Sequence, residues 1–431
     1  MRNSLIQVHN SCLPVIQERQ RRAVNHLRHP GLDPGSHQLG QSQGIAGQAL
    51  NDGIEDIGVY VHIPFCQKKC LYCDFPSQAG QEIYFESYKE ALISEIDNSP
   101  ELAASSIDSI FFGGGTPTII PADYLAEILE HIYRYSVAAD AEVTIEANPG
   151  SVSPESLKVL FQSRFNRISF GAQAWQDHLL NCLGRIHCQD DILYAYEAAV
   201  NAGFTNINLD LMFALPGQTM DDWMETLKSA AGLKPAHISA YSLMIEDDTT
   251  FGHLYNEGEL HFPSEVEDRR MNQAIVDVLD LYGYHQYEIS NYSLEGMECH
   301  HNIKYWKRCP YIGLGTCSHS FYDDTRWHNT HCLEKYLSVA GKQNNVNLHE
   351  ECINISVPEA MSETMFLGLR LNEGIDVQGF YNTFGVSLLE IYGSTIDKMT
   401  ECGLIRQAKG KLFLTTKGRD VSNYVFINFL C

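Results

Sequence analysis

Short apolar runs alternate with longer amphipathic stretches over the first half of the chain, beginning near residue 57. The runs are rich in β-branched and aromatic residues, as buried strands are, and the stretches between them repeat apolar residues with helical spacing. The pattern predicts strands at 57–64, 109–115, 142–148, 167–173, 206–213 and 237–243. It predicts helices near 82–97, 121–133, 153–163, 190–202 and 219–232. Strands separated by helices indicate an α/β fold with a parallel sheet, either doubly wound or curled into a partial barrel.

Residues suited to chemistry stand at the carboxyl ends of these predicted strands. Cys66 follows the first strand, Gly114 lies in the glycine run that ends the second, and Glu146 ends the third. Gln173 ends the fourth strand, and Asp210 lies late in the fifth. Functional residues of parallel α/β folds gather at the carboxyl ends of the strands, so we expect these residues on one rim.

The rest of the chain follows other patterns. Residues 1–55 are rich in Gln and Gly and lack a sustained period, which predicts a disordered extension or a mis-assigned translation start. The regular pattern makes 56–285 one domain, and the irregular polar and aromatic segment 286–355 is expected to complete it. The end, 356–431, predicts helices at 359–371, 377–384 and 388–402 and a hairpin at 404–414, which is a winged-helix-like α+β domain.

Charge and cysteine content exclude some classes of function. The formal net charge is −24, from 30 Lys and Arg against 54 Asp and Glu, so the chain repels phosphate backbones and we expect no nucleic-acid partner. No apolar stretch approaches the ~18 residues of a membrane span, which favours a soluble protein. Thirteen cysteines without an apolar signal peptide before them favour a reducing compartment, so a cytoplasmic location is expected.

Three cysteines with the spacing CxxxCxxC, Cys66, Cys70 and Cys73, are the strongest chemical signal in the sequence. Three thiolates can hold three irons of a [4Fe-4S] cluster and leave the fourth iron open to another ligand, whereas an electron-transfer cluster would use four cysteines. The alternatives are a structural zinc site with His62 as fourth ligand, or unrelated buried cysteines. Zinc typically uses paired CxxC units, so the spacing favours the cluster.

The sequence around these cysteines resembles a known family. The run from Tyr60 to Phe75 is similar to the radical S-adenosylmethionine (SAM) family of oxygen-independent coproporphyrinogen III oxidases and related heme chaperones, and the likeness extends from about residue 57 to the C-terminus. The resemblance implies a partial (β/α)6 TIM-like barrel with a C-terminal winged-helix-like domain over its mouth. It also implies that SAM chelates the open iron and is cleaved by one-electron reduction. Tyr60 and Tyr72 are then expected beside SAM.

Other residues match positions that contact SAM in this family. Gly114, Gly115 and Thr116 match its GGGTP loop, in which missing side chains let backbone N–H groups approach the amino acid part of SAM. The remaining matches are Glu146, Gln173, Arg185 and Asp210. An arginine fork and carboxylates suit a zwitterionic amino acid and ribose hydroxyls. For any one of these side chains, a structural salt bridge or a helix cap is the alternative interpretation.

Two positions separate the branches of the family. The oxidase has a fourth cysteine two residues after the third, and Phe75 stands there, which argues against oxidase activity and leaves open whether the chain is an enzyme. The run from His301 to Trp306 matches the HNxxYW motif of the heme-chaperone branch. Neutral imidazole is a good axial ligand of heme iron, so His301 is the candidate ligand. The alternative is a surface loop whose aromatic residues pack on the barrel.

We therefore expect a heme chaperone that binds a [4Fe-4S] cluster, SAM and heme and delivers heme to apo-hemoproteins such as respiratory enzymes, membrane-associated recipients included. The first alternative is an oxygen-independent coproporphyrinogen III oxidase, which decarboxylates porphyrinogen propionates. The second is a radical-SAM enzyme that opens or methylates tetrapyrroles. A winged-helix-like end would otherwise suggest DNA binding, but acidic residues offset its lysines. The sequence leaves open whether the protein forms a homodimer.

Overall fold

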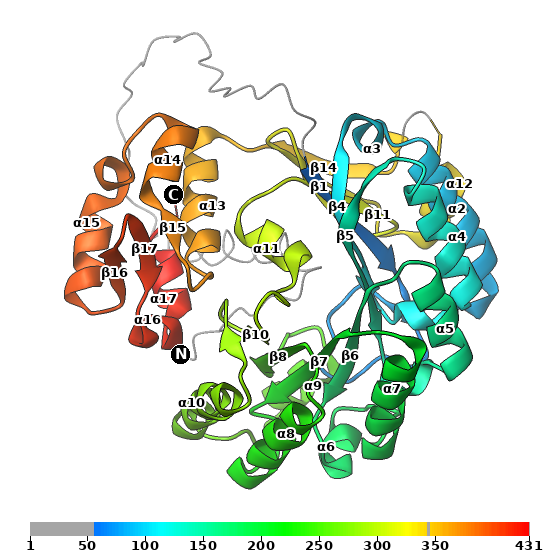
Figure 1. The fold of residues 1–431 in the computed structure, drawn as a ribbon, viewed down its shortest axis with the longest axis horizontal. Coiled ribbons are helices and arrows are strands. Elements are labelled where there is room, and N and C mark those ends of the chain that lie inside the picture. Colours follow the sequence, from blue (N-terminus) through cyan, green and yellow to red (C-terminus); the bar gives the residue numbers. More distant parts are fainter. Residues whose placement is uncertain (1–55, 343–344, 431) are drawn as a thin grey trace.

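A curved sheet wrapped by helices and a smaller domain beside it make up the described part of the chain. The computed structural model describes residues 56–342 and 345–430, so the predicted extension at 1–55 lies outside the described residues. Figure 1 shows the helices on the outer side of the sheet, the C-terminal domain apart from it, and helix α11 (His300–Trp306) between the two. Within the described residues, no helix is long and apolar enough to cross a membrane.

Parallel strands form the centre of the sheet, and helices connect them. The strands are β1 (Asp56–Ile63), β4 (Ser106–Gly114), β5 (Ser136–Ala147), β6 (Arg167–Gln173), β7 (Asn206–Phe213) and β8 (His237–Ser242). The main helices between them are α2 (Phe85–Asp97), α4 (Ala122–Ile132), α5 (Pro154–Gln162), α7 (Gln189–Ala202) and α8 (Met220–Gly232). Their order in the sheet follows the chain, so right-handed crossovers place every helix on one face. This order confirms the partial barrel and not the doubly wound sheet.

The segment 286–355 is more regular than its sequence pattern predicts. At one end of the sheet it adds β10 (Asn291–Ser293), next to β9 (His285–Gln286). At the other end it adds β11 (Tyr311–Leu314), β12 (His319–Tyr322), β13 (Thr325–Asn329) and β14 (His349–Asn354), which makes a 12-stranded sheet of the described residues. These strands are short and rich in His and aromatic residues, so they show little apolar alternation in the sequence.

The C-terminal domain has the predicted winged-helix-like order. It contains α13 (Val357–Gly368), α14 (Val377–Phe384), α15 (Leu388–Glu401) and the hairpin of β16 (Ile405–Ala408) and β17 (Lys411–Leu414). Three elements were not predicted: β15 (Ile375–Asp376), which pairs with β17, and the helices α16 (Thr416–Asp420) and α17 (Ser422–Ile427). The domain has its own hydrophobic core, and that core also includes Tyr305 and Trp306 of α11.

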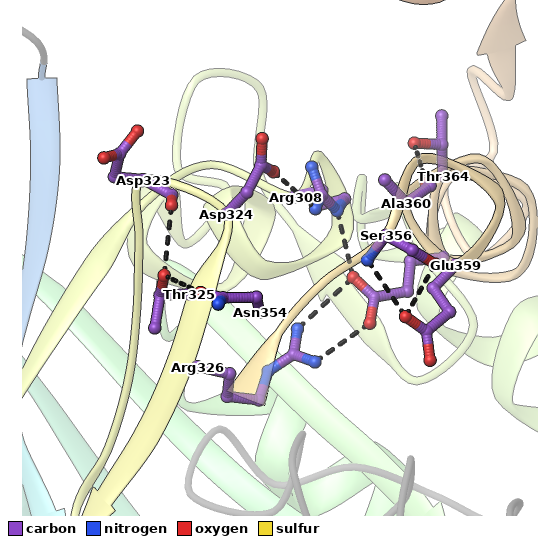
Figure 2. A network of polar contacts seen from close by, with 11 residues as sticks. Arg308, Asp323, Asp324, Thr325, Arg326, Asn354, Ser356, Glu359, Ala360 and Thr364 are labelled. Atoms are coloured by element: carbon purple, nitrogen blue, oxygen red, sulfur yellow. Dashed lines mark hydrogen bonds and ion pairs between the residues drawn. The ribbon is translucent and has the colours of Figure 1, made fainter. Parts of the chain in front are cut away.

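A buried ionic network joins this domain to the sheet. Oε2 of Glu363, on α13, accepts a hydrogen bond from Arg308 Nε, and its Oε1 accepts one from Arg326 Nη1, both at 2.9 Å. Figure 2 shows Arg308, which follows α11, and Arg326 of β13 turned toward one unlabelled carboxylate, which their hydrogen bonds identify as that of Glu363. Arg370 adds a second link, because its guanidinium lies 4.3 Å from the ring centre of Trp306. Helix α11 is therefore held from the domain side by charged side chains.

Candidate iron–sulfur and SAM site

The three cysteines of the motif lie on the loop that follows β1, at the carboxyl end of the parallel strands. Cys66 ends the short strand β2 (Phe65–Cys66) and is buried, whereas Cys70 and Cys73 are partly exposed. All three line one cavity of about 210 Å³, whose wall includes rim residues and residues deeper in the barrel. The structure thus brings the predicted triad together.

Burial lowers the acidity of two of these thiols, Cys66 and Cys73. It raises the pKa of Cys66, and it raises the pKa of Cys73 to about 12, with the charges of Cys70 and Cys66 adding to the latter shift. Thr116 Oγ1 lies 3.8 Å from Cys66 Sγ and donates to it. Buried thiols in this state stay protonated at neutral pH, so binding of a metal must release their protons.

The donor set fits a cluster held by three thiolates. His62, the fourth ligand of the zinc alternative, is engaged elsewhere: hydrogen bonds join its Nδ1 to Tyr60 Oη at 3.1 Å and its Nε2 to Pro76 O at 2.9 Å. Within residues 56–342 and 345–430, no three His, Cys, Asp or Glu side chains are gathered closely enough to hold a single metal ion. An iron–sulfur cube holds its thiolates at separate corners and does not require them to meet at one point.

The glycine loop packs against the cysteine loop. A Cβ on Gly115 would lie 2.4 Å from the carbonyl oxygen of Phe65 and 3.0 Å from Cys66 Sγ, and Gly114 has φ +112°. Gly115 N donates to Ile63 O and Thr116 N to Phe65 O, both at 2.8 Å. These N–H groups are therefore engaged within the protein. The glycines are needed for close backbone contact with the cysteine loop, and the approach of these N–H groups to SAM stays a prediction.

The polar residues matched to SAM lie together on the wall of the cavity, with Tyr72 among them. The matched residues that line it are Tyr72, Gly114, Gly115, Thr116, Glu146, Gln173, Arg185 and Asp210. Asp210 accepts hydrogen bonds from Ser169 Oγ at 3.0 Å and Asn208 Nδ2 at 2.8 Å, so its carboxylate is held in place. Gly114 N donates to Glu146 Oε2 at 3.2 Å. The common rim predicted from the strand ends is thus present.

Arg185 has an unmet donor that fits a ligand. Its Nη1 donates to Asn148 Oδ1 at 2.6 Å, while its buried Nε has no hydrogen-bond partner among the described residues. Burial opposes its charge, but Tyr72 and the neighbouring thiols raise its pKa above the ordinary value. A positively charged fork with a free N–H, facing a cavity lined by three thiols, suits the carboxylate of an amino acid ligand.

Two neighbours complete these contacts: sequence reasoning placed Asn148 at the end of the third predicted strand without giving it a partner, and it missed Tyr241. Asn148 holds Arg185, and Tyr241 donates from Oη to Gln173 Oε1 at 3.1 Å. Both line the cavity, and both stand at the carboxyl end of a parallel strand, a position that marked the other candidates. Tyr60 is not among the residues that line the cavity, and its ring stacks on that of Phe111, which does line it. The contact of Tyr60 with SAM stays a prediction.

His301 is completely buried. Hydrogen bonds join its Nδ1 to Ser109 Oγ and its Nε2 to Tyr305 Oη, each at 3.0 Å, and its ring stacks on Phe111. Burial lowers its pKa to about 3, so the imidazole is neutral. Both nitrogens are engaged, so His301 is unable to ligate iron in this arrangement. Its neighbour Asn302, which sequence reasoning did not single out, lines the cavity.

Comparison with known proteins first gives the class. The model of the radical SAM superfamily matches residues 60–230, and the model of the HemN C-terminal domain matches residues 355–421. The structure of the Escherichia coli coproporphyrinogen III oxidase HemN has a TM-score of 0.77 at 22% identity, covering 88% of this chain and 91% of that one. The chain is a radical SAM protein with the HemN fold, and this class implies a [4Fe-4S] cluster and SAM.

Curated relatives then define the family. A heme chaperone HemW of Bacillus subtilis is 36% identical over 374 residues, which is 86% of this chain and 98% of the relative. The heme chaperone HemW of Lactococcus lactis is 37% identical over 86% of this chain and 96% of its own length. The mitochondrial radical S-adenosyl methionine domain-containing protein 1 of Danio rerio is 30% identical over 88% of this chain and 85% of its own length. The chain belongs to the HemW family.

Proposed function

We propose that this protein is a heme chaperone, which holds a [4Fe-4S] cluster on Cys66, Cys70 and Cys73, binds SAM and heme, and delivers heme to apo-hemoproteins such as respiratory enzymes. The observation that carries the proposal is the 36–37% identity to heme chaperones over 86% of the chain. When bound, the cluster supplies an electron to SAM. The chain's own residues hold and orient SAM through Arg185 and the carboxylates of the rim.

Phe75 is the residue that counts against the alternative, oxygen-independent coproporphyrinogen III oxidase. It lines the cavity beside Cys73, where the oxidase branch has a cysteine, and a phenyl ring supplies no thiol chemistry. The shared fold at 22% identity does not distinguish the two activities. Anaerobic incubation with SAM, a reductant and coproporphyrinogen III tests the alternative. We expect no protoporphyrinogen, and formation of this product at the rate of an oxidase would replace the proposed function.

Heme ligation by His301 remains part of the proposal and requires a movement. Glu142 of β5 accepts hydrogen bonds from the backbone N–H groups of His300 at 3.0 Å and His301 at 3.1 Å, which fixes the start of α11. Because both imidazole nitrogens are also bonded, iron binds His301 only after α11 shifts away from Ser109. Heme binding through this residue is then expected to be slower than diffusion.

A hemin titration of the anaerobically reconstituted protein tests the function. We expect a Soret-band complex in the wild type, and weaker binding in His301→Ala. The exposed His253→Ala is the matched control and is expected to bind hemin like the wild type. Absence of a Soret complex in the wild type would overturn the chaperone proposal. Equal binding by His301→Ala would remove the assigned ligand and leave the function in place.

A further inference from the structure

The cavity extends far below the rim that holds the cysteines. Arg167, Ser169, Gly171 and Gln173 alternate along β6, and all of them line it. Six residues of strand at about 3.3 Å each put Arg167 roughly 20 Å from Gln173. Small inward residues such as Ser169 and Gly171 leave the centre of the barrel open, where larger side chains would fill it.

The inner end of this cavity contains polar atoms without partners. Within the described part of the chain, Arg167 Nε, Ser290 Oγ, Asn291 Oδ1 and Asn302 Oδ1 are buried and make no hydrogen bond. All four residues line the cavity, and their exposed fractions are only 2–8%. Buried polar atoms without partners cost free energy, and native structures contain few. Their gathering in one cavity indicates groups that a ligand completes.

Arg167 Nε makes no hydrogen bond to the acidic neighbours of Arg167, although their negative charges stabilise its guanidinium. Burial opposes the positive charge, but Cys299, Glu142, Tyr287 and Asp210 raise the pKa of Arg167 above its ordinary value. Glu142 accepts from α11 and Asp210 accepts from Ser169 and Asn208, so every oxygen of these two carboxylates has another donor. The guanidinium is left charged and with a free N–H.

The other three residues add a hydroxyl and two amides to the wall of the same cavity. Asn291 Nδ2 donates to Glu288 Oε1 at 2.6 Å, which orients its Oδ1 as an acceptor, suited to a bridging water. Ser290 can donate its hydroxyl hydrogen. The unpaired Oδ1 of Asn302 is an acceptor, so Asn302 contacts an anion only through its Nδ2. A guanidinium with a hydroxyl and an amide donor matches the hydrogen-bonding pattern of a carboxylate.

We propose that Arg167, Ser290 and Asn302 form a second subsite at the inner end of the cavity, which binds a carboxylate arm of the tetrapyrrole. The inference rests on the proposed function, because it takes the carboxylate to be a propionate of the porphyrin. It gives the HNxxYW motif a second role: Asn302 contacts the ligand directly while His301 packs α11 on β4. Arg167 contributes the charge, and Asn291 holds a water beside it.

Metal-free mesoporphyrin IX separates this subsite from iron ligation. Binding of the free diacid and of its dimethyl ester to the reconstituted full chain is followed by porphyrin fluorescence. In the wild type we expect the diacid to bind about tenfold more tightly than the ester, the usual effect of a hydrogen bond to a charged group. Arg167→Met is expected to abolish this preference, and Ser290→Ala and Asn302→Ala to reduce it about threefold each. Arg269→Met, at an exposed arginine, is the control.

The outcomes separate the subsite from the proposed function. If hemin forms its Soret complex but diacid and ester bind equally well to the wild type, the subsite is overturned and the chaperone function stands. If hemin does not bind, the function falls with the subsite. Should Arg167→Met fail to fold, the Ser290 and Asn302 variants decide, because neither removes a hydrogen bond of these atoms in the ligand-free protein. If both of these variants prefer the diacid over the ester as strongly as the wild type does, the subsite is overturned.

Discussion

Two buried polar regions of this molecule differ in how their hydrogen bonds are satisfied. In the network between sheet and C-terminal domain, both oxygens of Glu363 accept hydrogen bonds from guanidinium groups (Figure 2). Among Glu363, Arg308, Arg326 and Arg370, the atoms that lack a partner among the described residues are Arg326 Nε and Arg370 Nε. At the inner end of the cavity, Arg167, Ser290, Asn291 and Asn302 each leave a polar atom without a partner.

The difference indicates what each region is for. Completed polar contacts contribute to the stability and geometry of the folded chain, and removing one member leaves its partners unpaired. Buried polar atoms without hydrogen-bond partners lower the stability of the ligand-free protein, so a group of them indicates a ligand-binding site. The network around Glu363 therefore fixes where α11 lies, and the cavity beside α11 is prepared for another molecule. The same short helix belongs to both regions.

The largest effect is expected at the outer end of the cavity. Cys70→Ser removes one thiolate of the triad, so the cluster loses an iron ligand and we expect the iron and sulfide content after reconstitution to fall close to background. Cys402→Ser, at an exposed cysteine outside the cavity, is the control and is expected to keep full content. Full cluster loading of Cys70→Ser would contradict the assignment of the triad.

Next in size is the loss of the network centre. Glu363→Ala leaves the guanidinium groups of Arg308 and Arg326 buried without their carboxylate, so we expect a loss of about 3–5 kcal/mol in the free energy of unfolding. Urea denaturation measures it. Asp324→Asn removes an exposed partner of Arg308, with a side chain that is 68% exposed against 6% for Glu363, and should cost less than about 1 kcal/mol. Equal losses of unfolding free energy in the two variants would contradict the greater role given to the buried carboxylate of Glu363.

Glu95 offers an intermediate case, a buried acid with complete contacts. It accepts from Tyr336 Oη, Gly315 N and Asn329 Nδ2, but burial outweighs these bonds and raises its pKa to about 7. The folded state therefore binds a proton that the unfolded state has released above about pH 4.5. Stability due to this group is complete below about pH 4.5 and is lost as pH rises to about 7, by about 3 kcal/mol.

Comparison of wild type with Glu95→Gln isolates this pH dependence. We expect the free energy of unfolding of the wild type to fall more steeply between pH 4.5 and 7 than that of the variant, because glutamine does not titrate. Chemical denaturation at several pH values gives the two slopes. Parallel slopes would show that Glu95 titrates near its ordinary value in the folded protein.

The smallest effect is expected where contacts are incomplete. In the ligand-free protein, Ser290→Ala and Asn302→Ala remove atoms without partners, so unfolding free energies should be unchanged or raised, by less than about 1 kcal/mol. Ser362→Ala is the matched control, since Ser362 Oγ donates to Phe429 O at 2.6 Å and its loss should cost about 1 kcal/mol. A clear destabilisation by Ser290→Ala would mean that its hydroxyl supports the fold.

Much of the barrel was predictable because its signals are local. The apolar runs at 167–173 and 206–213 coincide with β6 and β7, and the run at 237–243 exceeds β8 by one residue. Strand β5 begins earlier than the apolar run that predicted it. The cysteine spacing likewise reads directly from the chain. The short strands β9 to β14 were not predicted, because a few residues gain their strand conformation from hydrogen bonds to neighbours already in the sheet.

Arg167, Ser290 and Asn291 could not be identified as a site from the sequence for a similar reason. Arg167 opens a predicted strand at the end opposite the cysteines, where sequence reasoning expects stability and not binding. Ser290 and Asn291 lie beyond the parallel strands and reach the cavity only because β10 pairs antiparallel with β8. Their common feature, a missing hydrogen-bond partner, exists only in three dimensions.

The sequence by itself determined the βα order, the cysteine triad and the rim residues, because hydrophobic period and residue spacing act over a few positions. Tertiary structure decided which part of the HNxxYW motif faces the cavity. Adjacent side chains on a helix point about 100° apart, so either His301 or Asn302 can face inward. Ser109, Phe111 and Tyr305 hold the imidazole, Glu142 fixes the start of α11, and the ring of His301 is buried while Asn302 lines the cavity.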